Sequence, residues 1–289
     1  MIDYWQLLLL GSIAGFTIFL GLPLAVLQNV SSKKKGFLNA IAIGILVFLI
    51  IDVFGHAWDS VGNVAQDTFS GKVAVSTGVS TILALFGGLA IGLLGLVFYE
   101  ERYMKKNLKQ KWREAGLDRS VASSGGEYQH QLQLLQEGNA YRLSMMIAMG
   151  IGFHNFSEGL AIGQSYASGA IGLAIILIIG FGAHNATEGF GIAGPLTGLV
   201  KKPRIRFLIL AGLVGGGPTF VGTVLGSLWT SAITSVFFLS IAGGALIYVS
   251  MLMYNSGRKQ TTNDILMLGI FVGLCAGFVT DLIVTLGGA

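Results

Sequence analysis

Two short stretches of the sequence repeat the same polar residues within apolar surroundings. Both read G-x-G-x-H-N-x-[S/T]-E-G, and they begin at Gly150 and Gly180. The repeat is specific, because the chain holds only 4 His and 14 Asp plus Glu. Each copy offers an imidazole, an amide and a carboxylate, and such groups bind divalent transition metals. The candidate metal ligands are His154, Asn155, Glu158, His184, Asn185 and Glu188.

The spacing within the motif places its ligands on one side of a helix. His and Glu are four residues apart and share a face, while Asn lies three residues before the same Glu. Each Glu can therefore serve a His layer and an adjacent Asn layer. A charged group at the centre of a membrane helix costs roughly 2.5–3.5 kcal/mol. The motif therefore needs partners or a cation, and Zn²⁺ is the first candidate, with Fe²⁺ or Mn²⁺ next.

The composition is that of a polytopic membrane protein. The chain has 289 residues, of which 53% are apolar and 11% charged, and its mean hydropathy is +0.73. Soluble domains carry about 25% charged residues. The single cysteine, Cys275, excludes an intrachain disulfide and a Cys-rich metal site. The N-terminus lacks a basic segment, so no cleaved signal peptide is expected. We expect one all-α transmembrane domain over residues 1–289.

Apolar windows long enough to cross a bilayer predict eight transmembrane helices. They cover residues 5–28, 38–58, 75–99, 141–165, 170–195, 204–229, 232–254 and 264–286. If the spans alternate in direction, all of the 18 Lys and Arg except Lys72 fall on one side. The positive-inside rule makes that side cytoplasmic. Both termini are then extracytoplasmic, and residues 100–141 form a long, partly helical cytoplasmic loop.

The charge pattern also bears on partners and location. Because the basic residues mark topology, we expect a lipid bilayer and no nucleic acid as partner. A multi-pass protein of the plasma membrane, or of a bacterial or archaeal inner membrane, fits this pattern. The oligomeric state stays open, with a homodimer as one candidate.

The two motifs lie on neighbouring spans that run in opposite directions. This arrangement predicts inverted-repeat symmetry about an axis in the membrane plane, which is typical of transporters that bind substrate near the midplane. The chain has no G-x-x-x-x-G-K-[S/T] motif, so ATP is not expected to drive it directly. No cofactor is expected, and the metal would be the substrate. Two alternatives stay open: a di-metal intramembrane enzyme, and a metal-binding helical bundle that does not transport.

A second polar pair precedes the motifs. Asp52 and His56 are four residues apart towards the outer end of the second span, and Trp58 follows them. They form a candidate entrance site that captures metal from outside. The alternative is an interfacial belt of polar and aromatic residues.

The motif residues resemble the ZIP (Zrt/Irt-like) divalent metal transporters, and within them the GufA-like branch. The family pattern is H-N-x-P-E-G in span 4, with a related His/Glu motif in span 5. The resemblance implies a transporter rather than an enzyme, eight spans and a long loop between spans 3 and 4. It also implies a main transport site and a second site beside it. The main site is His154, Glu158, His184 and Glu188, and the second adds Asn155 and Asn185 to the same glutamates.

The chain departs from the family pattern at three positions. Ser157 and Thr187 stand where the family carries Pro, and Gly217 stands where many members have an acid in span 6. Without that acid, the repulsion between two divalent ions is poorly offset. We therefore expect one strongly bound metal and a weak or empty second layer. A carboxylate introduced at position 217 is expected to strengthen that layer.

Overall fold

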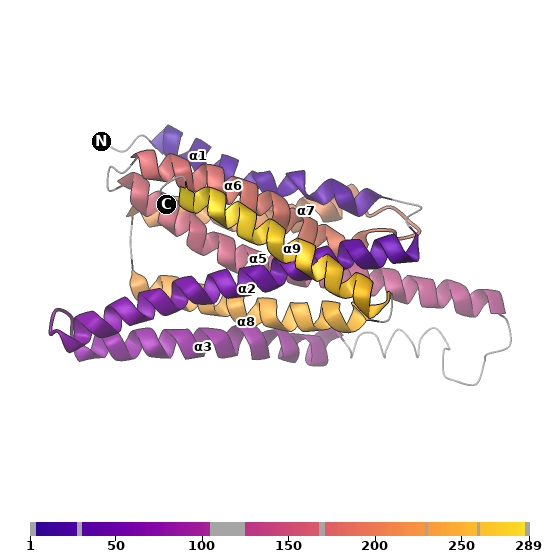
Figure 1. Ribbon diagram of the computed structural model, residues 1–289, viewed down its shortest axis with the longest axis horizontal. Helices are drawn as coiled ribbons and strands as arrows, with labels where there is room; N and C mark the ends of the chain where they lie inside the picture. The colour runs from indigo at the N-terminus through magenta and orange to yellow at the C-terminus, as the bar shows by residue number, and fades with distance from the viewer. Residues whose placement is uncertain are drawn as a thin grey trace.

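The computed structural model describes residues 4–27, 31–104, 125–167, 171–228, 231–258 and 261–286. Every regular element in these ranges is helical, which confirms the all-α prediction (Figure 1). The long helices are α1 (Tyr4–Phe16), α2 (Ser32–Phe69), α3 (Val75–Tyr99), α5 (Gly125–Ala167), α6 (Ile171–Ala193), α7 (Ile205–Leu228), α8 (Ala232–Gly257) and α9 (Asn263–Leu286).

Six segments of the described chain are long and apolar enough to cross a membrane. They are the N-terminal segment Tyr4–Val26, which includes α1, and the helices α2, α3, α7, α8 and α9. Helices α5 and α6 carry the polar motifs. The chain is therefore a multi-pass helical membrane protein by length and composition.

Two helices are longer than the sequence windows predict. Helix α2 begins where the Ser31 hydroxyl accepts a hydrogen bond from the Lys34 amide, and it ends just before Gly71, whose φ is +74°. It therefore extends well beyond the expected window 38–58 in both directions. Helix α5 begins at Gly125, inside the segment predicted as a loop. Residues 105–124 of that segment lie outside the described residues.

The first span is not one continuous α-helix. After α1 come two 3₁₀ segments, η1 (Thr17–Leu20) and η2 (Leu22–Val26). The Thr17 hydroxyl donates to the Ala14 carbonyl at 2.6 Å, and Pro23 has no amide hydrogen for an α-helical bond. Shorter irregular segments also extend α3 (η3, Glu100–Met104) and follow α6 (η4, Gly194–Leu196).

Successive long helices run in alternate directions along the bundle (Figure 1). The beginning of α1 and the end of α9 lie at the same end, together with the turn that joins α2 to α3. The starts of α2, α5 and α7 lie at the opposite end. That opposite end carries Lys33, Lys34 and the exposed Lys202, Arg204 and Arg206. The basic residues named here therefore gather at one end of the bundle.

Glycines let neighbouring helices approach closely. Helix α3 packs along α8, where a Cβ at Gly92 would collide with the Ile241 carbonyl. Helix α9 packs along α2, where a Cβ at Gly273 would collide with the Ile41 carbonyl. Close backbone contact through small residues is how helices gain packing energy in lipid.

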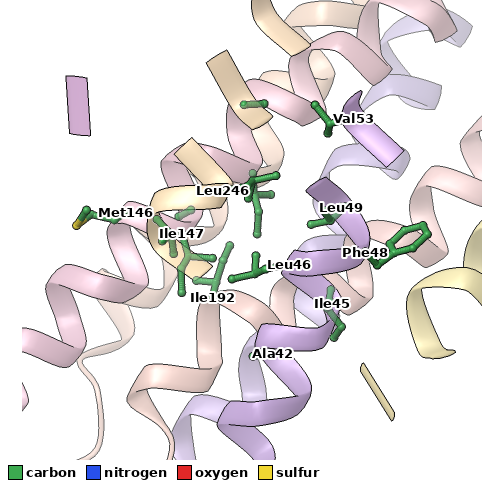
Figure 2. Packing of buried hydrophobic residues seen from close by; sticks show 14 of the residues in the cluster. Ala42, Ile45, Leu46, Phe48, Leu49, Val53, Met146, Ile147, Ile192 and Leu246 are labelled. Atoms are coloured by element: carbon green, nitrogen blue, oxygen red, sulfur yellow. The ribbon is translucent and has the colours of Figure 1, made fainter. Parts of the chain in front are cut away.

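The largest apolar cluster lies between α2, α5, α6 and α8. Figure 2 shows Leu46 and Leu49 of α2 facing Ile147 of α5, Ile192 of α6 and Leu246 of α8. All five side chains are buried. Along α2, α5 and α6, these apolar residues lie closer to the basic end of the bundle than the polar motif residues do.

Candidate metal site

His154 is the centre of a buried charged cluster. Its Nε2 atom lies 3.3 Å from Glu158 Oε1 on the same helix and 3.9 Å from Glu188 Oε1 on α6. The Asp52 carboxylate of α2 approaches the same nitrogen at 3.9 Å. Three helices thus bring three carboxylates to one imidazole. His154, Glu158 and Glu188 are all buried, and Glu188 is fully enclosed.

The pair predicted as an entrance site is continuous with this cluster. Asp52 Oδ1 lies 3.4 Å from His56 Nε2, while its other oxygen faces His154. The His56 side chain is 67% exposed and that of Asp52 only 13%. Helix α2 continues to Phe69, so Asp52 lies in mid-helix, farther from the helix end than the predicted window 38–58 implies. A polar path therefore leads from the surface at His56 to the buried centre.

The two motif asparagines make matching contacts with neighbouring helices. Asn155 donates through Nδ2 to Glu188 Oε2 at 2.9 Å and to the Gly215 carbonyl of α7 at 3.0 Å. Asn185 donates through Nδ2 to the Ala14 carbonyl of α1 at 2.7 Å. Both Oδ1 atoms are buried and have no hydrogen-bond partner among the described residues. Each amide thus anchors its motif to a partner helix and keeps an oxygen available.

The final glycines of the two motifs, like the asparagines, make matching contacts with neighbouring helices. A Cβ at Gly159 would collide with the Thr219 carbonyl of α7, and one at Gly189 would collide with the Ile18 carbonyl of η1. Thr219 lies four residues after Gly215, and Ile18 lies four residues after Ala14, so the two motif copies have the same spacing of contacts. Close approach at these glycines positions both motifs against their partners.

The remaining predicted residues are placed as follows. His184 lies in α6 between the described Gly182 and Asn185, but its side chain is outside the described residues. Ser157, at the family's proline position, is buried, and its hydroxyl has no partner in the described part of the chain. Thr187 is half-buried in α6. Neither residue interrupts its helix, which is continuous across both motifs.

The carboxylates of the charged cluster surround the His154 side chain and do not surround a vacant position that a metal ion could occupy. In the described part of the chain, no three His, Cys, Asp or Glu side chains are placed to hold one metal ion as they stand. The carboxylates instead face the imidazole nitrogen. A metal would have to take the place of these direct contacts, with neutral imidazole and ionised carboxylates as its ligands.

Gly217 does not face the asparagine layer. A Cβ at this position would meet nothing within 4 Å, and the residue lines an open crevice whose other lining residues are apolar. The effect of a carboxylate at position 217 on the second layer stays a prediction, and the added side chain would enter this crevice. The carbonyls of Gly215 and Thr219 contact α5 at the motif, whereas Gly217 borders the crevice together with Gly152.

A smaller polar cavity of about 320 Å³ lies on the other side of the motif from the apolar cluster. It is lined by residues from α2, α5 and the start of α8, including Ser60, Ser157, Gln164, Ser231 and Ser235. Ser157 directly precedes Glu158, so the cavity reaches the edge of the buried charged cluster. Hydroxyl and amide groups suit water and hydrated ions better than lipid.

Sequence reasoning missed three features of the site. It did not place Asp52 among the central residues, although the charge of an acid in an apolar window was the available signal. It also missed the backbone carbonyls of Gly215 and Ala14, because carbonyl acceptors leave no mark on the residue type.

Comparison with known proteins gives a distant, partial similarity. No family model matches the chain. The chain is 29% identical to zinc transporter ZIP10 of Mus musculus and 28% identical to zinc transporter ZIP10 of Homo sapiens, in both cases over 163 residues. Each match covers 53% of this chain and 19% of the relative, so the chain spans about a fifth of the length of these relatives. This similarity supports the resemblance to the ZIP family that the two motifs indicate.

Proposed function

We propose that this chain is a membrane transporter for a divalent transition metal, with Zn²⁺ as the first candidate. The observation that carries the proposal is the approach of Asp52, Glu158 and Glu188 to His154 from three helices. Three acids around a buried imidazole supply the charge and the ligand types that Zn²⁺, Fe²⁺ and Mn²⁺ accept. The similarity to proteins named zinc transporters supports Zn²⁺ among them. The GufA-like branch is part of the same proposal.

The contacts around His154 and the repeat of the motif support the choice of ligands. We propose that His154, Glu158, Glu188 and Asp52 bind the metal, together with His184 from the second motif copy. A divalent ion here would offset the cost of several buried acids, which would otherwise oppose folding in lipid. Asn155 and Asn185, through their buried Oδ1 atoms, would border this site as a weaker second layer.

We further propose eight transmembrane spans related by an inverted repeat. The repeat would relate α1, α2 and α3 to α7, α8 and α9, and α5 to α6. Its support is the matched pairing of elements: α5 packs on α7 as α6 packs on α1 and η1, and α3 packs on α8 as α9 packs on α2. Equivalent helices run in opposite directions (Figure 1). Such symmetry gives a protein two related conformations that expose a central site to opposite sides.

The surroundings of the cluster support access from one side in this conformation. The polar cavity reaches Ser157 on one side of the charged cluster. On the other side, Leu46, Ile147, Ile192 and Leu246 are buried against one another (Figure 2). We propose that an ion enters through the cavity past His56 and Asp52. Separation of the apolar cluster would then release it towards the basic end.

Metal flux into proteoliposomes tests the proposal directly. Purified protein reconstituted into sealed vesicles should take up radioactive Zn²⁺, and Glu188→Gln should abolish uptake. The control is Asp67→Asn, which removes an exposed acid at the far end of α2 that pairs with Lys72. This control should transport as the wild type does. Vesicles that bind Zn²⁺ but accumulate none would favour the metal-binding bundle. Zn²⁺-dependent turnover of a substrate without flux would favour the enzyme.

A further inference from the structure

An open apolar crevice of about 640 Å³ lies behind the motif, between α5 and α7. It shares no residue with the charged cluster, and none of its lining residues is charged. Its walls include Phe16, Gly152, Phe153, Val214, Gly217 and Phe238, from four helices. Phe153 is 39% exposed, so the crevice opens onto the outer surface of the bundle.

This crevice lies in the apolar part of the membrane span. Helix α7 is a candidate span from end to end, and the lining residues occupy its middle. An apolar cavity does not hold water well, and an empty one forfeits dispersion contacts along its walls. Within a bilayer, the apolar groups at hand to fill it are lipid chains. Gly217 has no side chain, and nothing lies within 4 Å of its Cβ position, so space for an acyl chain remains there.

A stripe along α7 connects the crevice to basic residues at the helix start. Arg206, Leu210, Leu213 and Gly217 are spaced by four, three and four residues, which places them along one face. Arg206 is exposed, as are Leu210 and Leu213. From Arg206 to Gly217 the helix rises about 16 Å, close to the roughly 15 Å thickness of one hydrocarbon leaflet. An acyl chain whose headgroup lies beside Arg206 therefore reaches the crevice.

The residues at the start of α7 supply the charge for a headgroup. Lys202, Arg204 and Arg206 are all exposed and lie within one turn of where α7 begins. Guanidinium and ammonium groups at a membrane surface attract anionic lipid headgroups. The apolar stripe suits the acyl chain of an anionic lipid, and the basic residues suit its headgroup.

We propose that this face binds an anionic phospholipid, with its phosphate at Lys202, Arg204 and Arg206 and one acyl chain in the crevice. The site depends on membrane insertion and does not depend on the proposed metal transport. The bound chain touches Gly152 and Phe153, which directly precede His154, and Phe238 of α8. The lipid chain therefore contacts both the motif helix and α8.

Native mass spectrometry of the full chain tests both halves of the site. The purified protein is titrated with phosphatidylglycerol and with phosphatidylcholine of the same chains. The wild type should retain phosphatidylglycerol more strongly, by about fivefold for each basic residue engaged. The Lys202→Gln/Arg204→Gln/Arg206→Gln triple variant should lose this preference while retaining both lipids equally.

A separate variant tests the crevice. Gly217→Leu places a side chain in the open space and should reduce retention of both lipids. Its control is Gly87→Leu on α3, where the glycine is also half-buried in a helix with nothing within 4 Å of its Cβ position. The control should retain lipid as the wild type does. Equal retention of lipid by Gly217→Leu and the wild type would overturn the crevice as the site of the chain.

Fluorescence quenching supplies a measurement that leaves Gly217 intact. In Phe153→Trp, the new indole borders the crevice, and phosphatidylglycerol with brominated chains should quench its emission. The quenching should exceed that by brominated phosphatidylcholine at the same concentration. Equal quenching by the two lipids, together with equal retention by the wild type, would show ordinary contact with the bilayer and no anionic site.

Discussion

The Asp52 carboxylate of α2 lies between two histidines, 3.4 Å from His56 Nε2 and 3.9 Å from His154 Nε2. One histidine is largely exposed and the other is buried. Asp52 therefore joins the surface of the protein to its charged centre. This position makes it a candidate both for capturing an ion and for holding it.

Substitutions of Asp52 and His56 should differ in their effect on metal affinity. Asp52→Asn removes a charge that faces the centre, whereas His56→Gln removes an exposed group. We expect Asp52→Asn to weaken Zn²⁺ binding by at least the 10–100-fold typical of groups that support metal ligands. His56→Gln should weaken it by less. Isothermal titration of the purified protein measures both, and equal losses would place Asp52 outside the central site.

The central glutamates should control stabilisation by metal. Zn²⁺ at about 100 times its Kd should stabilise the wild type by about 2.7 kcal/mol. The Glu158→Gln/Glu188→Gln double variant should show no such gain. Without metal, the double variant should be at least as stable as the wild type, because it buries neutral amides in place of acids. Thermal unfolding followed by tryptophan fluorescence tests both statements. An equal gain with Zn²⁺ in both proteins would contradict the assignment.

One strongly bound metal is expected in the histidine layer. Two divalent ions about 4 Å apart repel by roughly 16 kcal/mol at an effective dielectric of 20, four times the energy of two unit charges. Asp52 adds its charge on the His154 side, and Asn155 and Asn185 add none. Anomalous scattering from Zn²⁺-soaked crystals should show a single strong peak beside His154. Two peaks of similar occupancy would show that neutral oxygens suffice for a second ion.

The α5–α7 contact should depend on glycine at particular positions. In Gly159→Ala the added methyl meets the Thr219 carbonyl, and such overpacking costs roughly 1–3 kcal/mol. Gly138→Ala, in the same helix, meets nothing within 4 Å. It should be neutral or stabilise the helix by up to about 1 kcal/mol. Chemical unfolding in detergent compares the two, and similar losses in both would mean that close approach at Gly159 does not matter.

The sequence by itself determined the helices and the identity of the motif residues. Long apolar runs cannot satisfy their backbone polar groups in lipid except as helices. The windows 75–99 and 264–286 therefore match α3 (Val75–Tyr99) and α9 (Asn263–Leu286) closely. Local spacing likewise predicted that His154 and Glu158 would meet, because residues four apart share a helix face.

Only the tertiary structure decided which residues from separate helices meet. Asp52 and His154 are joined by the crossing of α2 and α5, and Asn155 finds Gly215 through the rotation of α7. The same rotation turns Gly217 into the apolar crevice and away from the asparagines. Such contacts depend on the angle, rotation and depth at which helices pack. The residue types and spacings within one helix do not encode those quantities. The sequence therefore identified the candidate ligands but did not predict how residues from separate helices are arranged.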